Sequence, residues 1–169
     1  MKKLIIISSS LNKDSMSFIW LQKVKEIAIE KWFDTDLIDL RKVNMPFCDS
    51  RKMEEYSEEI QQIAKKLDET DYIVFWTPVY CYSLSGVLKN FIDIFAKFMT
   101  WKKFWVFEQA WTKLSYLAVS DLQKIVWFEC ESQPIFPVIL TDYSSYKNWS
   151  LTDIKSIEKI DDMLNNFLK

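Results

Sequence analysis

The chain has 169 residues and a formal net charge of −2, because 22 Lys and Arg stand against 24 Asp and Glu. A net charge so near zero creates no overall field that would attract nucleic acid or an anionic membrane. No apolar run approaches the ~20 residues that span a bilayer. We therefore expect a cytoplasmic protein whose partners include neither nucleic acid nor a membrane.

The absence of histidine and the small number of cysteines narrow the possible chemistry. Without His there is no Ser-His or Cys-His pair and no His-bound metal. Cys48, Cys81 and Cys130 are widely spaced and form no Cys-x-x-Cys pair, so we expect buried free thiols and no disulfide framework or zinc site. If the protein is an enzyme, we expect a cofactor to supply the chemistry.

Strand and helix signals alternate along the whole chain. Continuous apolar runs, which indicate strands buried on both faces of a parallel sheet, predict strands at residues 3–8, 35–40, 72–77, 103–107 and 135–140. Helix-period segments predict helices at residues 15–31, 57–68, 84–98, 112–128 and 152–168. Five such units with right-handed crossovers place helices on both faces of the sheet. We predict one domain over residues 1–169, an α/β fold with three α/β/α layers, doubly wound around a five-stranded parallel sheet of order 2-1-3-4-5.

In such a sheet a ligand binds outside the carboxyl ends of the strands, where the strand order reverses. The first of the two loops concerned is Ser8-Ser9-Ser10-Leu11-Asn12-Lys13-Asp14-Ser15-Met16-Ser17, which leads directly into the first helix. Hydroxyl groups and free N–H groups at a helix N-terminus form an anion site suited to a phosphate monoester. The alternative is simple N-capping by Asp14 or Ser15. The loop has neither a Walker lysine pattern nor Gly-x-Gly-x-x-Gly, which disfavours a nucleoside triphosphate or a dinucleotide.

The second loop follows the third strand and is the most specific stretch of the chain. It reads Thr77-Pro78-Val79-Tyr80 and continues to Ser85-Gly86-Val87-Leu88-Lys89-Asn90 and Asp93. This pattern resembles the NAD(P)H-dependent FMN reductase family, whose strand ends in Thr-Pro-x-Tyr before a helix with Ser-Gly-x-Leu-Lys-Asn. The Ser10-x-Asn12-x-x-Ser15-x-Ser17 pattern is similar to the phosphate loop of that family, with Asn12 where an Arg is commoner. The resemblance implies a flavodoxin-like fold.

The resemblance also implies a cofactor, a reaction and a set of site residues. Flavin mononucleotide (FMN) would be reduced by NADPH or NADH and would pass the electrons to a small-molecule acceptor, such as a quinone, a flavin or an azo compound. The phosphate would be held by Ser10, Asn12, Ser15, Met16 and Ser17. The isoalloxazine ring would lie against Thr77, Pro78, Val79, Tyr80, Cys81, Ala110 and Trp111. The chain departs from the family at Val79 and Cys81, where Glu and Asn are frequent, and at Trp111, where a glycine-rich turn is usual.

Two other functions stay open at this stage. A flavodoxin-type electron carrier would bind FMN without a substrate of its own, and the acidic pI of about 5.3 is compatible with that role. A flavin-free interaction domain is the second alternative. Relatives commonly form homodimers or homotetramers, and the aromatic stretch at residues 91–104 is either such an interface or a buried third helix.

Tryptophan and glycine occur in inverted proportion. The chain has 8 Trp and 1 Gly, whereas average usage gives roughly a dozen glycines in this length. Trp32 follows the first helix at its C-cap, Trp76 takes the small-residue position before Thr-Pro, Trp111 lies in the flavin loop, and Trp127 and Trp149 fall at a helix end and a turn. Our hypothesis is that the source organism decodes UGA as glycine, whereas the printed chain reads it as tryptophan. The alternative is a protein truly rich in tryptophan.

Overall fold

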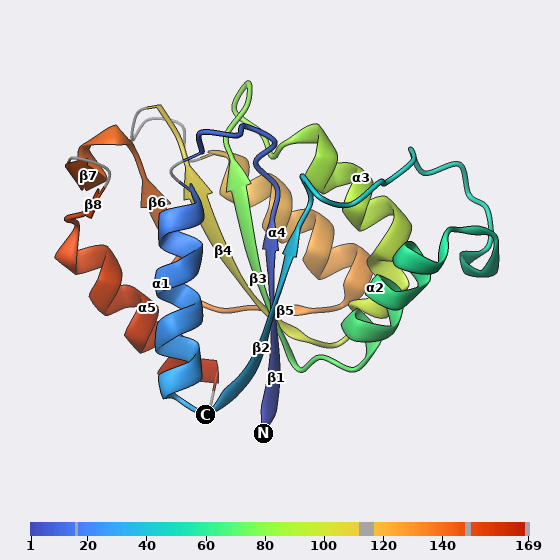
Figure 1. Cartoon of the computed structure of the whole chain (residues 1–169), viewed down its shortest axis with the longest axis horizontal. Coiled ribbons are helices and arrows are strands. Elements are labelled where there is room, and N and C mark those ends of the chain that lie inside the picture. Colours follow the sequence, from blue (N-terminus) through green and yellow to red (C-terminus); the bar gives the residue numbers. More distant parts are fainter. Residues whose placement is uncertain (16, 112–116, 148–149, 168–169) are drawn as a thin grey trace.

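A computed structural model describes residues 1–15, 17–111, 117–147 and 150–167 (Figure 1). Its central sheet is parallel and has the order β2-β1-β3-β4-β5, with β6 also paired to β4. The strands are β1 (Lys2–Ser8), β2 (Phe33–Asp39), β3 (Tyr72–Pro78), β4 (Lys103–Gln109), β5 (Gln133–Pro134) and β6 (Ile139–Thr141). The predicted strand order 2-1-3-4-5 is therefore confirmed.

The fifth strand differs from the prediction of one continuous strand at residues 135–140. Two short strands, β5 and β6, share this position beside β4. Pro134 ends the first, and a cis Phe136–Pro137 bond lies between the two. Proline has no N–H group to donate to a ladder, which explains why the pairing is interrupted here.

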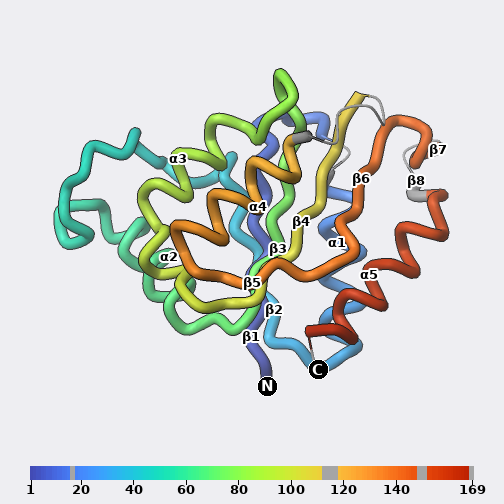
Figure 2. Tube along the Cα trace, turned by 180° about the vertical axis from the view of Figure 1, so that it is seen from behind, coloured from blue at the N-terminus to red at the C-terminus, as the bar shows by residue number. Residues whose placement is uncertain are grey.

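Five α-helices cover the two faces of the sheet. They are α1 (Ser17–Glu30), α2 (Glu58–Asp68), α3 (Gly86–Phe95), α4 (Leu117–Cys130) and α5 (Ile154–Phe167). Helices α1 and α5 lie on one face, and α2, α3 and α4 lie on the other (Figure 2). The three predicted layers are thus present. Residues 112–116, predicted as the start of the fourth helix, lie outside the described residues.

Alternating side chains of each strand supply the two halves of the core. In β1, Leu4 and Ile6 point to the α1–α5 face while Ile5 and Ile7 point to the other. All four are buried, as the continuous apolar run predicted. Burial on both faces is the property that a parallel sheet between two helical layers demands.

Smaller elements connect the main ones. Helix α3 ends at Phe95 and continues as the 3-10 turn η2 (Ala96–Phe98), so the predicted helix at residues 84–98 is divided. Two further 3-10 turns are η1 (Met53–Glu55) and η3 (Tyr143–Ser145). The sequence patterns did not predict the short antiparallel pair of β7 (Tyr146–Lys147) and β8 (Ser150–Leu151) before α5.

Three expectations about side chains need correction or refinement. Cys48 and Cys81 are exposed and only Cys130 is buried, so the expectation of buried thiols was wrong for two of the three; all three are free. In the aromatic stretch at residues 91–104, Phe91 and Phe104 are fully buried in the core, which favours the packing alternative for them. No helix among the described residues is long and apolar enough to cross a bilayer.

Candidate functional site

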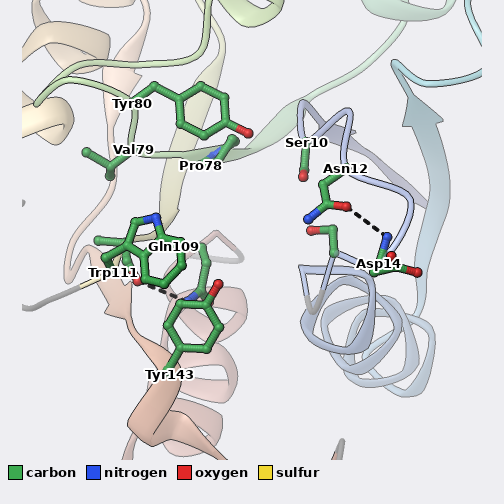
Figure 3. Close-up of a pocket in the computed structure, with 11 residues that line it drawn as sticks. Ser10, Asn12, Asp14, Pro78, Val79, Tyr80, Gln109, Trp111 and Tyr143 are labelled. Atoms are coloured by element: carbon green, nitrogen blue, oxygen red, sulfur yellow. Dashed lines mark hydrogen bonds between the residues drawn. The ribbon is translucent and has the colours of Figure 1, made fainter.

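A cavity of about 420 Å³ opens over the carboxyl ends of β1, β3 and β4 (Figure 3). Its size falls within the range of small-molecule sites. It lies between the loop after β1 and the loops after β3 and β4, at the position where the strand order reverses. Its lining residues are Ser10, Asn12, Asp14, Ser15, Pro78, Val79, Tyr80, Gln109, Ala110, Trp111 and Tyr143.

A buried hydrogen-bond network holds the loop after β1 in place. The Ser9 N–H and Oγ–H groups both donate to the Trp76 carbonyl oxygen, at 3.1 and 2.8 Å. The Ser85 hydroxyl donates to Ser9 Oγ at 3.1 Å and accepts from the Leu88 N–H group, so it also caps helix α3. Ser9 and Ser85 are almost completely buried. One network therefore joins the starts of the loops after β1 and β3.

Beyond Ser9 the loop turns toward the first helix and becomes accessible. Asn12 Oδ1 accepts a hydrogen bond from the Asp14 N–H group at 3.0 Å, and the Asn12 carbonyl accepts one from Ser15 at 3.2 Å. Helix α1 starts at Ser17, so its N-terminal turn follows directly on the cavity wall. None of the eleven described lining residues is Lys or Arg. An anion in this half would be held by neutral donors and the helix N-terminus.

The loop after β3 forms the opposite wall as a tight hairpin. The Tyr80 N–H and carbonyl groups exchange two 3.0 Å hydrogen bonds with Ser83. Cys81 and Tyr82 between them have φ values of 49° and 62°, as both central residues of a type I′ turn require. The Val79 N–H group donates to the Gln109 carbonyl at 2.9 Å and so ties this hairpin to the end of β4.

The loop after β4 closes the third side with a polar anchor and two aromatic rings. Gln109 Oε1 accepts hydrogen bonds from Thr141 Oγ1 and from the Tyr146 hydroxyl, both at 2.7 Å. Burial raises the pKa of Tyr146 well above its ordinary value, which keeps this hydroxyl a donor. Trp111 is 75% exposed and packs against Tyr143 with ring centroids 4.9 Å apart. Figure 3 shows both rings facing the side chains of Ser10 and Asn12 across the cavity.

Glu108 lies one residue before this wall and points away from it. Strand alternation directs it to the face of Phe104 and Val106, where it is fully buried and both carboxyl oxygens lack a hydrogen-bond partner. Burial, with a further contribution from the negative charge of Asp121, raises the pKa of Glu108 to about 8. The side chain therefore stays protonated at neutral pH.

The cavity brings together most of the residues predicted to bind FMN, namely Ser10, Asn12, Ser15, Pro78, Val79, Tyr80, Ala110 and Trp111. The Thr77 side chain is buried and bonded to the Pro78 carbonyl and the Ser85 N–H group, so it supports the wall from behind. Cys81 is exposed at the hairpin tip and does not line the cavity. Met16 lies outside the described residues, as does the side chain of Ser17.

Sequence reasoning missed three lining residues, Asp14, Gln109 and Tyr143. Asp14 and Gln109 are direct neighbours of predicted residues, and the carboxyl end of a strand is a signal that could have identified Gln109. Tyr143 follows β6, and the same rule applied to the fifth strand would have pointed to its loop.

The cavity fits FMN in size and in the kind of groups that line it. Hydroxyl and amide donors beside the start of α1 suit a phosphate. The opposite half is formed by apolar and aromatic side chains, which suit a flat ring system. The fold and this pocket together define a flavodoxin-like nucleotide-binding protein.

Comparison with known proteins gives the family. The chain belongs to the NADPH-dependent FMN reductase family, whose model matches residues 2–137. A curated relative, an NAD(P)H-dependent FAD/FMN reductase of Geobacillus thermodenitrificans, is 34% identical over 61 residues, which are 36% of this chain and 33% of that protein. The aligned part thus spans about a third of the length of that relative.

Solved structures agree with the fold. The flavoenzyme FerB of Paracoccus denitrificans, an NAD(P)H:acceptor oxidoreductase, superimposes with a TM-score of 0.82 at 18% identity, covering 99% of this chain and 96% of that one. An NAD(P)H:quinone oxidoreductase of Methanothermobacter marburgensis gives a TM-score of 0.71 at 12% identity, covering 99% of both chains. At these identities the likeness concerns the fold.

Proposed function

We propose that this protein is an FMN-dependent NAD(P)H oxidoreductase that reduces a small acceptor such as a quinone, a flavin or an azo compound, and that it works in the cytoplasm as a single-domain subunit. The observation that carries the proposal is the cavity at the strand-order reversal, with neutral donors and a helix N-terminus at one end and apolar and aromatic groups at the other. Bound FMN supplies the chemistry, since it takes a hydride from NADH or NADPH and passes electrons on.

The protein residues bind and orient the cofactor in this proposal. Ser10, Asn12 and Ser15 donate to the phosphate, together with Met16 and Ser17 at the start of α1. The Pro78-Val79-Tyr80 segment lies along one edge of the ring, and Ala110 and Trp111 lie against another. Thr77 holds the first of these segments in position through its hydrogen bonds. Val79 and Ala110 also form a small apolar cluster with Ala118, which excludes water from this side.

Reconstitution with FMN tests the proposal. The purified protein is mixed with FMN, and binding is followed by quenching of flavin fluorescence and by visible absorbance. We expect stoichiometric binding, followed by bleaching of the flavin absorbance when NADPH or NADH is added without oxygen. Steady-state oxidation of NAD(P)H with a quinone then separates a reductase from an electron carrier. A protein that stays colourless with excess FMN would contradict the proposal.

A pair of asparagine variants makes this test specific to the cavity. Asn12→Ala removes an exposed lining amide and is expected to weaken FMN binding about tenfold, which corresponds to the ~1.4 kcal/mol of a hydrogen bond to a charged group. Asn165→Ala is the matched control, because Asn165 is exposed in the last turn of α5, far from the cavity. Equal effects of the two substitutions would place the flavin elsewhere.

We extend the proposal to a homodimer or homotetramer. Phe47 and Phe128 are 86% and 77% exposed, and both flank helix α3 near Asp93. The Cys48 thiol contacts the Asp93 carbonyl, and Phe128 lines a surface depression together with Asp93. Exposed aromatic side chains of this kind support an interface. Sedimentation velocity of the protein and of Phe128→Ser tests it, with a smaller assembly expected for the variant.

A further inference from the structure

Two tryptophans have the backbone conformation that glycine adopts without cost. Trp32 has a φ of 65° directly after α1, and Trp101 has a φ of 57° in the turn before β4. Positive φ is a genuine outlier for a bulky residue, because its Cβ meets the following carbonyl oxygen. Both side chains are 80% exposed, so packing offers no compensation. The expectation that Trp32 stands at a glycine-type helix cap is confirmed for its backbone.

Other tryptophans are poorly placed as side chains. Trp20 and Trp76 are fully buried, and the indole N–H group of each has no hydrogen-bond partner, whereas a buried indole normally finds one. Trp127 is 59% exposed in the last turn of α4. Trp105 is the counterexample, since it is buried and its Nε1 donates to the Pro137 carbonyl at 2.5 Å. Trp149 lies outside the described residues.

Trp111 links this pattern to the pocket. Its indole forms part of the cavity wall and packs against Tyr143, opposite the side chains of Ser10 and Asn12 (Figure 3). A glycine at this position would remove the ring from the wall and leave the backbone N–H groups of the loop open to a ligand. The cavity would then be wider on its ring side, while its phosphate side would be unchanged.

We infer that the source organism makes this protein with glycine at its tryptophan positions, because it decodes UGA as glycine, and that glycine at position 111 tightens the binding of FMN. The composition supports the first part, with 8 Trp and 1 Gly in 169 residues, as do the left-handed backbone at positions 32 and 101 and the unpartnered indoles at positions 20 and 76. The second part rests on the proposed function.

The gene and the native protein test the first part without any assay of function. We expect the codon TGA at positions 32, 76, 101 and 111, and peptides of the protein purified from its source organism should have the masses of glycine there. TGG codons at these positions would overturn the inference, since TGG encodes tryptophan under either reading of TGA. A tryptophan mass at position 32 or 101 in the native protein would overturn it as well.

Backbone strain gives an independent measurement on the expressed chain. Trp32→Gly and Trp101→Gly each relieve a left-handed conformation, so each is expected to raise the midpoint of thermal unfolding by about 2–4 °C. Trp105→Gly is the matched comparison, because it removes a buried, hydrogen-bonded indole and should lower that midpoint. A fall in all three variants would contradict the assignment at positions 32 and 101.

Flavin binding tests the second part. We expect Trp111→Gly to bind FMN at least tenfold more tightly than the printed chain, measured by quenching of flavin fluorescence. Trp127→Gly, an exposed replacement outside the cavity, should bind like the printed chain. Equal affinity of all three would overturn the role of position 111. If none of them binds FMN, including a version with glycine at all eight positions, the proposed function is wrong, whereas the codon and mass results stand by themselves.

Discussion

The two sides of the pocket treat their buried polar groups differently. On the phosphate side, Ser9 and Ser85 are buried and every hydroxyl bond leads to another paired group. On the ring side, Glu108 is equally buried but both of its carboxyl oxygens lack a partner. The first arrangement stabilises the loop that it holds, and the second costs free energy whenever the carboxyl group ionises. Stability and ligand contact are thus distributed unequally around one cavity.

The largest expected effect concerns Glu108 and depends on pH. Below pH ~4.5 the carboxyl group is protonated in both the folded and the unfolded chain, so its burial brings no ionisation penalty. Between that pH and about 8 the unfolded chain loses the proton while the folded chain keeps it, so the free energy of unfolding falls as the pH rises. Glu108→Gln removes this dependence. We expect the variant to be more stable than the parent at pH 8 by on the order of 3 kcal/mol, and nearly equal at pH 4.5.

Urea denaturation at several pH values measures this difference. Glu158→Gln is the matched control, because Glu158 is exposed on α5 and should show no such trend. A constant difference between Glu108→Gln and the parent over the whole pH range would mean that Glu108 is ionised in the folded protein.

A smaller loss is expected on the phosphate side. Ser85→Ala removes the cap of α3 and the hydrogen bond to Ser9, which should lower the free energy of unfolding by about 1–2 kcal/mol. Ser57→Ala is the control, since Ser57 stands at the N-cap of α2 without a side-chain hydrogen bond to the helix. Chemical denaturation of both variants provides the comparison, and equal losses would show that the network adds nothing beyond helix capping.

The smallest expected effect is electrostatic and concerns FMN binding. Asp14 places a carboxylate in the half of the cavity assigned to the phosphate. Asp14→Asn should therefore bind FMN about two- to fivefold more tightly at low ionic strength, and the gain should shrink in salt. Asp162→Asn makes the same charge change on the exposed side of α5. The two variants are titrated with FMN at low and high salt. A salt-independent gain, or the same gain in both, would count against a phosphate beside Asp14.

Much of the fold could be predicted because local patterns determine it. The apolar run of β1 and the alternation of strands with helices were sufficient for the strand order and for the three layers. The interruption between β5 and β6 was also readable, since Pro134 and Pro137 stand within a few residues of each other. The β7–β8 pair could not be predicted, because two-residue strands carry no periodicity.

The site divides along the same line. Loops at the carboxyl ends of β1 and β3 were located from topology alone, and most of their predicted residues line the cavity. The inward direction of Thr77 follows from strand alternation, because it shares its face with Ile73 and Phe75. The exposure of Cys81 depends on a two-residue turn with positive φ, for which Cys and Tyr give no sequence signal. Tyr143 reaches the cavity through tertiary packing that no local pattern records.

The hairpin at Tyr80 has a practical consequence for spectroscopy. Its two hydrogen bonds between Tyr80 and Ser83 hold the cavity wall, and they leave Cys81 at the outward tip with an accessible thiol. With Cys48 replaced by serine and Cys130 buried, a thiol-directed fluorophore or spin label would attach at Cys81 alone. Such a label would stand one residue from a lining side chain without entering the cavity, and would report when the wall moves.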